Sequence, residues 1–116
     1  MKRLGQTDIR LSPIGLGTVK FGRNQGVKYP TPFDLPDMAH LKNLLSVGRE
    51  LGVNHLDTAP SYGLSEERLG VLLEGQRKDW IIVGKVGEEF KDGTSTYIFT
   101  PEHFKKSLER SLKRLK

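Results

Sequence analysis

Three side chains with acid–base or hydroxyl chemistry follow segments of extended character: Asp57, Tyr62 and Lys85. Asp57 closes one such segment, Tyr62 lies in the turn after it, and Lys85 ends the next segment. In parallel sheets with crossover helices, reactive groups gather at the carboxyl ends of the strands. A lysine at such a position is expected to be partly buried and to need a counter-charge, which Asp57 on the adjacent strand could supply.

Tyr62 is a candidate general acid if a cation lies beside its phenol. A positive charge favours the phenolate, so the pKa of a tyrosine, ordinarily about 10, moves toward working pH. Such a phenol can give its proton to a reacting group. The alternative interpretation is structural, because an aspartate and a lysine at strand ends often form only an ion pair and a tyrosine in a turn often only packs. Spacing alone leaves both interpretations open.

The segments that must position these side chains alternate between extended and helical patterns. Residues 2–16 are predicted to form short extended pieces around a turn at residues 5–8. The first strand of the sheet is predicted at residues 14–17. Two further strands are predicted at residues 53–58 and 81–83. The last of them is β-branched, which is typical of a strand buried on both faces.

Three helices are predicted between and after these strands. The first begins after the N-cap Asp37 and stops at Gly52, and the second is capped by Ser65 and ends at Gly75. The third begins at Thr100-Pro101 and continues to the last residue. The positions expected to form their buried faces are Leu41, Leu44, Leu45 and Leu51 in the first, Leu69, Leu72 and Leu73 in the second, and Phe104, Leu108, Leu112 and Leu115 in the third. Residues 22–37 and 88–97 are interpreted as loops.

A hairpin followed three times by strand and helix is typical of right-handed βαβ units and a parallel sheet. Two α/β architectures fit this order, a doubly wound sheet and an eight-unit barrel. A complete barrel needs roughly 250 residues. The 116 residues of the chain can supply three of its eight units, so we expect a chain cut short inside a larger fold.

The composition excludes several classes of protein. There is no cysteine, so disulfides are excluded, and the longest apolar run, residues 80–83, is far shorter than the roughly 20 residues of a membrane helix. No apolar signal core follows the N-terminus, and we expect a cytoplasmic protein without membrane partners. Most of the net charge of +5 lies in residues 101–116, where six Lys and Arg face two Glu. This run lacks interleaved aromatic residues, so we expect no nucleic-acid binding.

Residues 52–70 read GVNHLDTAPSYGLSEERLG. This segment closely resembles the aldo/keto reductase signature, in which Gly, Asp-Thr-Ala, Tyr-Gly, Ser-Glu and Leu-Gly occur at this spacing. Residues 4–18 are similar to the family's bottom-capping hairpin and first strand, and residues 81–87 resemble its strand with the catalytic lysine. The resemblance spans essentially the whole chain, but only the N-terminal part of the family's barrel.

The resemblance implies a TIM (β/α)8 barrel, with residues 1–116 as the N-terminal portion of its single domain: a β-hairpin and three β/α units. It implies hydride transfer from NADPH to a small-molecule aldehyde or ketone, with no metal site. Tyr62 would be the proton donor to the carbonyl oxygen, and Lys85 would lower the pKa of Tyr62. Asp57 would hold Lys85 while itself lying near the nicotinamide ribose. The segment with Gly17 and Thr18 would pass beneath the nicotinamide end of NADP(H).

The chain departs from the family pattern because the family's fourth catalytic residue is a His on the next strand. We do not expect His40, His55 or His103 to replace it. The family also binds most of its cofactor through later loops, so we expect the 116 residues alone to be inactive. The alternative is a non-catalytic half-barrel that serves as a binding or oligomerisation module and self-associates through its exposed strand edge.

Overall fold

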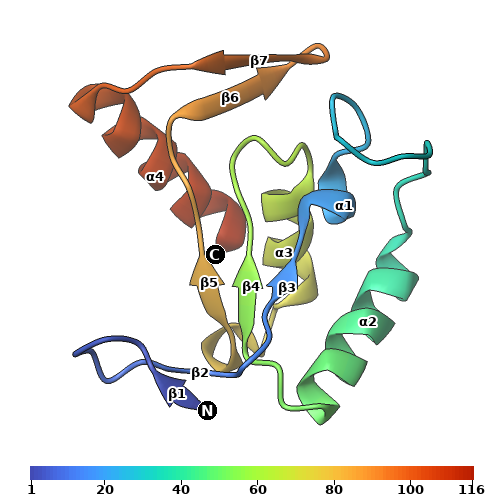
Figure 1. The fold of residues 1–116 in the computed structure, drawn as a ribbon, viewed down its shortest axis with the longest axis vertical. Coiled ribbons are helices and arrows are strands. Elements are labelled where there is room, and N and C mark those ends of the chain that lie inside the picture. Colours follow the sequence, from blue (N-terminus) through green and yellow to red (C-terminus); the bar gives the residue numbers. More distant parts are fainter.

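Three parallel strands form the centre of the computed structural model, which describes all residues 1–116 (Figure 1). They are β3 (Leu16–Gly17), β4 (His55–Asp57) and β5 (Ile81–Val83), in the order β3-β4-β5. The register pairs Gly17 with Asp57 and Asp57 with Val83. The three strands therefore end at the same level, and the segments that follow them meet at one end of the sheet.

Helices follow each strand, as expected for βαβ units. After β3 come α1 (Val19–Gly22) and α2 (Met38–Glu50), and α3 (Ser65–Leu72) follows β4. A 3-10 turn (Arg77–Asp79) precedes β5, and α4 (Pro101–Leu115) is the last element. The parallel α/β arrangement is confirmed, whereas the closed eight-unit barrel stays a prediction. No helix in the structure has the length and apolar character that crossing a membrane requires.

Two of the three predicted helix starts are confirmed. The Asp37 carboxylate accepts a hydrogen bond from the backbone N–H of His40 at 2.7 Å, and the Thr100 hydroxyl accepts one from the N–H of His103 at 3.2 Å. The prediction that Ser65 caps its helix is wrong, because Ser65 is the first residue of α3 and Leu64 occupies the cap position without a side-chain bond. The Ser65 hydroxyl instead turns inward, where it bonds other buried hydroxyls.

Two antiparallel hairpins lie at opposite ends of the sheet (Figure 1). The predicted one pairs β1 (Lys2–Arg3) with β2 (Arg10–Leu11). The second pairs β6 (Glu88–Lys91) with β7 (Thr94–Tyr97), so the interpretation of residues 88–97 as a loop is wrong. Its turn is Asp92-Gly93, and both residues have positive φ. An Asp-Gly pair between two strands is among the strongest short-range sequence signals for a hairpin. The strands around it are too polar for their alternation to stand out.

The core lies between the sheet and its helices. Its buried members are Phe21, Leu41, Leu45, Leu56, Leu69, Leu72, Leu73, Trp80 and Leu115. Leu56 is the middle residue of β4 and is completely buried, while His55 and Asp57 on the opposite face of that strand are only half-buried. This alternation places Asp57 on the face of the sheet away from the core.

Three expectations about burial are wrong. Of the four leucines expected on the buried face of the first helix, Leu41 and Leu45 are buried, but Leu44 is 36% and Leu51 79% exposed. In α4, Leu115 is buried as expected and Phe104 is half-buried, but Leu108 and Leu112 are 55% and 61% exposed, and Ser107 and Ser111 are buried instead. The reason is a close approach of backbones: a Cβ on Gly70 of α3 would lie 1.9 Å from the carbonyl oxygen of Arg114, so small residues form this contact. Strand β5 is not buried on both faces, because Ile81 and Ile82 are only half-buried and Val83 is 40% exposed.

Candidate active site

The carboxyl ends of β4 and β5 bring together the three residues expected to do chemistry. The Lys85 ammonium forms a hydrogen-bonded ion pair with Oδ1 of Asp57 and donates to the carbonyl oxygen of Thr58 at 3.1 Å. The same ammonium lies 5.1 Å from the centroid of the Tyr62 ring. The end of β4 with the turn after it and the end of β5 thus supply a carboxylate, a phenol and a cation to one place.

The electrostatics of this group favour a charged lysine. Partial burial lowers the pKa of Lys85, but the hydrogen bond to Asp57 and the electrostatic interactions with Tyr62 and Asp57 outweigh it, so the pKa of Lys85 is raised above 10.5. The Lys85 and Asp57 side chains are 45% and 47% exposed. The pair is therefore held in place and is still reachable by a ligand.

The raised pKa of Lys85 predicts a loss of stability at alkaline pH. A folded-state pKa above the unfolded value stabilises the protein fully below about pH 10.5, and this contribution disappears as the pH rises through the folded pKa. The free energy of unfolding of the wild type minus that of Lys85→Met should therefore be constant up to about pH 10 and fall above it. Urea denaturation across this range measures the difference. In an Asp57→Asn background the fall should be smaller, because the folded-state pKa of Lys85 drops toward the unfolded value while the unfolded-state pKa, which sets where the fall begins, is unchanged. A difference that stays flat with Asp57 in place would contradict the assignment.

Buried hydroxyls support the end of β4 from below. Thr18 is completely buried, and both its backbone N–H and its hydroxyl donate to the carbonyl oxygen of Asp57 at 2.9 Å. The Ser65 hydroxyl donates to that of Thr18 at 2.9 Å, which leaves the Thr58 hydroxyl, 3.0 Å away, as the donor to Ser65. Thr18 thus positions Asp57 by bonding the main-chain carbonyl of Asp57. The Thr18 side chain is buried and cannot contact a ligand at the surface.

Gly17 lies at the exposed end of β3, directly opposite Asp57 in the register. A Cβ built on Gly17 would meet no atom within 4 Å, so the space beside the carboxylate is open. The Oδ2 atom of Asp57 makes no hydrogen bond within the chain and can accept one from a ligand hydroxyl. Asp57 and Gly17 are therefore the residues that could contact one end of a cofactor. Thr18 would not contact the cofactor and would only hold Asp57 in position.

A cavity of about 530 Å³ opens beside Tyr62. The segment after β3 lines it with Val19, Val27 and Tyr29, and β7 lines it with Ser95 and Tyr97. All three tyrosines of the chain therefore face one cavity. Arg23, Lys28 and Glu88 line the cavity as well, so the space beside Tyr62 has apolar, aromatic and charged walls, which is the usual character of a small-molecule site.

Sequence reasoning missed the ion pair at this cavity, which Arg23 and Glu88 form. Burial raises the pKa of the Glu88 carboxyl, but hydrogen bonds from Ser95, Ser61 and Arg23 outweigh it and lower the pKa below 4.5. No local pattern singles out either residue, because each lies in a segment interpreted as a loop and their side chains meet across 65 positions.

None of the three histidines contacts Asp57, Tyr62 or Lys85. Nδ1 of His55 lies 3.2 Å from the Ser12 hydroxyl, and its ring packs on Gly15, where a Cβ would come within 2.0 Å. His40 is exposed on α2, and Nε2 of His103 lies 3.1 Å from Oε1 of Glu89. These contacts are those of residues that hold the structure together.

Comparison with known proteins agrees with the motifs and the geometry. The sequence pattern of the aldo/keto reductase family matches residues 13–116, nearly the whole chain. The chain belongs to the aldo/keto reductase family. Its relatives include the uncharacterized oxidoreductase YqkF of Bacillus subtilis (strain 168), which is 30% identical over 119 residues, and this match covers 99% of the chain and 35% of YqkF.

Solved structures give the same family. A crystal structure of a Pseudomonas aeruginosa protein assigned to the aldo-keto reductases is 54% identical, with a TM-score of 0.88, and the match covers 98% of the chain and 42% of that protein. A second aldo-keto reductase structure from Pseudomonas aeruginosa gives a TM-score of 0.87 at 54% identity, with coverage of 98% and 41%. This aldo/keto reductase chain thus spans between a third and a half of the length of the relatives it matches.

Proposed function

We propose that Asp57, Tyr62 and Lys85 are catalytic residues of a reductase that converts aldehydes or ketones to alcohols. Membership of an oxidoreductase family supports redox chemistry in general. The observation that carries the narrower proposal is the position of the Lys85 ammonium, which contacts the Asp57 carboxylate and faces the Tyr62 ring beside an open cavity. A purely structural ion pair would not need a phenol and a cavity next to it.

The three side chains divide the work of proton transfer. A reduced nicotinamide, when bound, would supply the hydride for the carbonyl carbon. Tyr62 gives its phenolic proton to the carbonyl oxygen, which becomes the alcohol hydroxyl. The Lys85 ammonium stabilises the phenolate that remains, and Asp57 holds Lys85 at that place. The lysine's raised pKa keeps it charged through the reaction.

The residues present fit the nicotinamide end of NADP(H). The free Oδ2 of Asp57 can accept a hydrogen bond from a ribose hydroxyl. Because Gly17 has no side chain, there is room for the ribose beside this carboxylate. We propose NADP(H) as the cofactor on the family resemblance. Because the chain spans 35% of YqkF and 42% of a solved relative, we propose the activity for a barrel that also contains the remaining units.

The experiment that tests the proposal combines mass, cofactor binding and turnover on protein isolated from its native source. Under the proposal, the reductase is heavier than 13.1 kDa, changes the fluorescence of NADPH on titration, and oxidises NADPH when a panel of aldehydes and ketones is added. A protein with an intact mass near 13.1 kDa that binds no NADPH would reject it and favour the second candidate.

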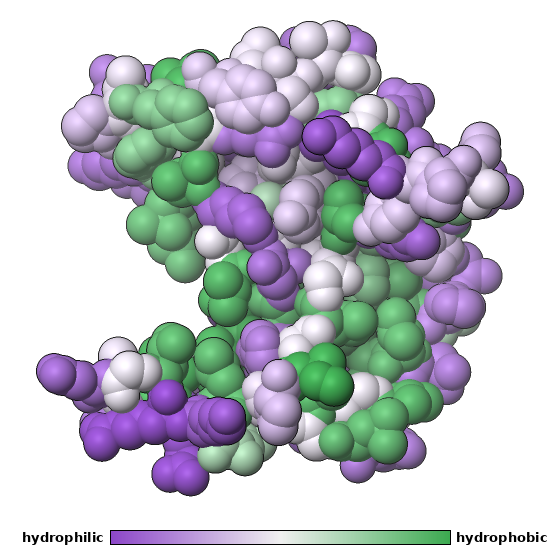
Figure 2. Space-filling view, viewed as in Figure 1, coloured by the Kyte–Doolittle hydropathy of each residue, from purple (hydrophilic) through white to green (hydrophobic).

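The second candidate is a non-catalytic module that binds a second copy of itself. The observation in its favour is the exposed apolar surface beside the free edge of β5, which includes Leu108 and Leu112 of α4. Figure 2 shows apolar surface around a hollow between the β1–β2 hairpin and the upper part of the molecule. In the same preparation, sedimentation velocity should then show association that increases with protein concentration.

A further inference from the structure

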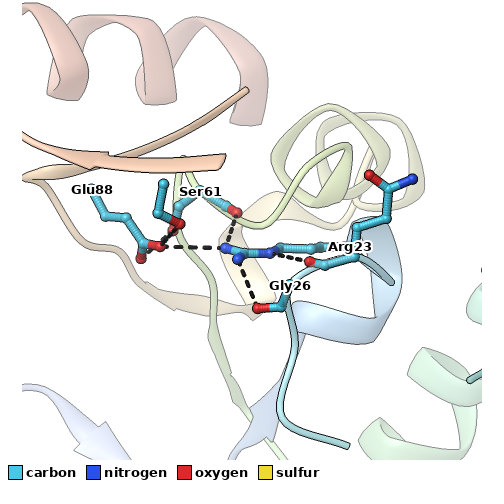
Figure 3. A network of polar contacts seen from close by, with 6 residues as sticks. Arg23, Gly26, Ser61 and Glu88 are labelled. Atoms are coloured by element: carbon cyan, nitrogen blue, oxygen red, sulfur yellow. Dashed lines mark hydrogen bonds and ion pairs between the residues drawn. The ribbon is translucent and has the colours of Figure 1, made fainter. Parts of the chain in front are cut away.

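Arg23 is a buried arginine whose side chain gathers four acceptors. Only 9% of the residue is exposed. Its Nε donates to the carbonyl oxygen of Gln25 at 2.8 Å and its Nη2 to that of Gly26 at 3.0 Å. Its Nη1 reaches the carbonyl oxygen of Ser61 at 3.1 Å and Oε1 of Glu88 at 3.4 Å (Figure 3). Every nitrogen of the guanidinium is therefore used.

These acceptors come from the segments after three different strands. Gln25 and Gly26 follow β3, Ser61 follows β4, and Glu88 begins the hairpin after β5. Glu88 extends the network, since its Oε1 also accepts from the Ser95 hydroxyl at 2.7 Å and its Oε2 from the Ser61 hydroxyl at 3.0 Å. One guanidinium thus joins the turn before α3 to the β6–β7 hairpin.

The flat face of the same guanidinium packs on an aromatic ring. Cζ of Arg23 lies 3.7 Å from the centroid of the Phe90 ring in β6, which adds a cation–π contact to the hairpin. A lysine could not replace these interactions, because it offers one compact charge in place of a planar fork that both stacks and donates in fixed directions.

The network ends one residue away from the phenol. Ser61 precedes Tyr62, so the bond to the Ser61 carbonyl holds the peptide group that leads into the tyrosine. A main-chain hydrogen bond from Leu64 to the Gly22 carbonyl oxygen, at 3.1 Å, ties the other side of the turn to the residue before Arg23. Arg23, Glu88, Tyr62 and Tyr97 all line the same cavity.

We propose that Arg23 is a positioning residue for Tyr62: it fixes the turn that carries the phenol against the hairpin that walls the cavity. That Tyr62 is a proton donor rests on the proposed function, but the effect of Arg23 on the position of Tyr62 does not depend on it. Without the guanidinium, the Ser61 carbonyl and the Glu88 carboxylate lose a shared charged partner, and within this network only the hydrogen bond from the Ser61 hydroxyl to Glu88 still joins the two walls, so they can shift relative to one another.

The test uses nuclear magnetic resonance on the protein labelled with ¹³Cζ-tyrosine, which gives three signals that single Tyr→Phe variants assign. In Arg23→Met the signals of Tyr62 and Tyr97 should both shift or broaden. Amide hydrogen exchange at Leu64 should speed up by about tenfold relative to Leu73, whose N–H bonds the carbonyl oxygen of Leu69 at the C-terminal end of α3, as loss of a charge-assisted hydrogen bond would allow. In Glu88→Ala the Tyr97 signal and the Ile98 amide should change, while Leu64 stays protected by the bond between Arg23 and Ser61.

Controls separate positioning from general stability. Arg3→Met removes an exposed ion pair at the opposite end of the sheet and should leave all three tyrosine signals in place. Arg23→Lys should resemble Arg23→Met, and a lysine variant with wild-type spectra would overturn the proposal. So would equal acceleration of exchange at Leu64 and Leu73 with an unmoved Tyr62 signal. If Arg23→Met does not fold, the lysine and Glu88→Ala variants decide. Shifted tyrosine signals in a protein without reductase activity would reject the proposed function and leave the positioning intact.

Discussion

Tyr62→Phe should abolish NADPH-dependent carbonyl reduction while leaving NADPH binding unchanged. The substitution removes only the phenolic hydroxyl and keeps the ring that faces Lys85 and lines the cavity. A positioned general acid contributes a rate factor of roughly 10² to 10⁴, so turnover should fall by about that much. The affinity for NADPH should hold, because the groups that fit the nicotinamide end are Asp57 and Gly17.

The measurement is the rate of NADPH oxidation at saturating aldehyde, together with a fluorescence titration of NADPH on the same variant. Lys85→Met provides the companion variant: it keeps the phenol, removes the cation that stabilises the phenolate, and should also lose turnover. Wild-type rates in Tyr62→Phe would remove Tyr62 from the chemistry and with it the proposed mechanism.

Gly63→Ala should destabilise the fold by about 2–4 kcal/mol. Gly63 has a φ of 56°, and a Cβ there would lie 2.0 Å from the carbonyl oxygen of Gly22 and 2.9 Å from its carbonyl carbon. The left-handed backbone costs alanine about 1 kcal/mol. Forcing the two backbones apart adds about 1–3 kcal/mol and moves the turn that carries Tyr62.

Gly5→Ala is the matched control, because Gly5 has nearly the same φ of 54° but open space around a Cβ. It should cost only the backbone term, about 1 kcal/mol. Urea denaturation of both variants measures the difference between them, which isolates the close approach of residues 22 and 63. Equal costs for the two variants would show that the approach can relax.

The hairpin at residues 88–97 shows where local information was present but too weak to use. Asp92-Gly93 is a strong turn signal, yet the strands on either side, Glu-Glu-Phe-Lys and Thr-Ser-Thr-Tyr, bury little apolar surface. The hairpin is held instead by distant partners, with Arg23 on one side and Arg110 of α4, which bonds Glu89 at 2.6 Å, on the other. Side-chain contacts of this kind have no periodicity along the chain.

The amino-acid sequence by itself determined the alternation of strands and helices, two helix starts, and the candidate group of Asp57, Tyr62 and Lys85. These features depend on caps, turn residues and motif spacing, which act over a few neighbouring positions. Only the tertiary structure decided which leucines of α4 are covered, why Ser65 turns inward, and that Arg23 reaches Ser61 and Glu88. Those outcomes depend on which surfaces meet. The type of an apolar or charged residue does not indicate which residue, 38 or 65 positions away, it will contact.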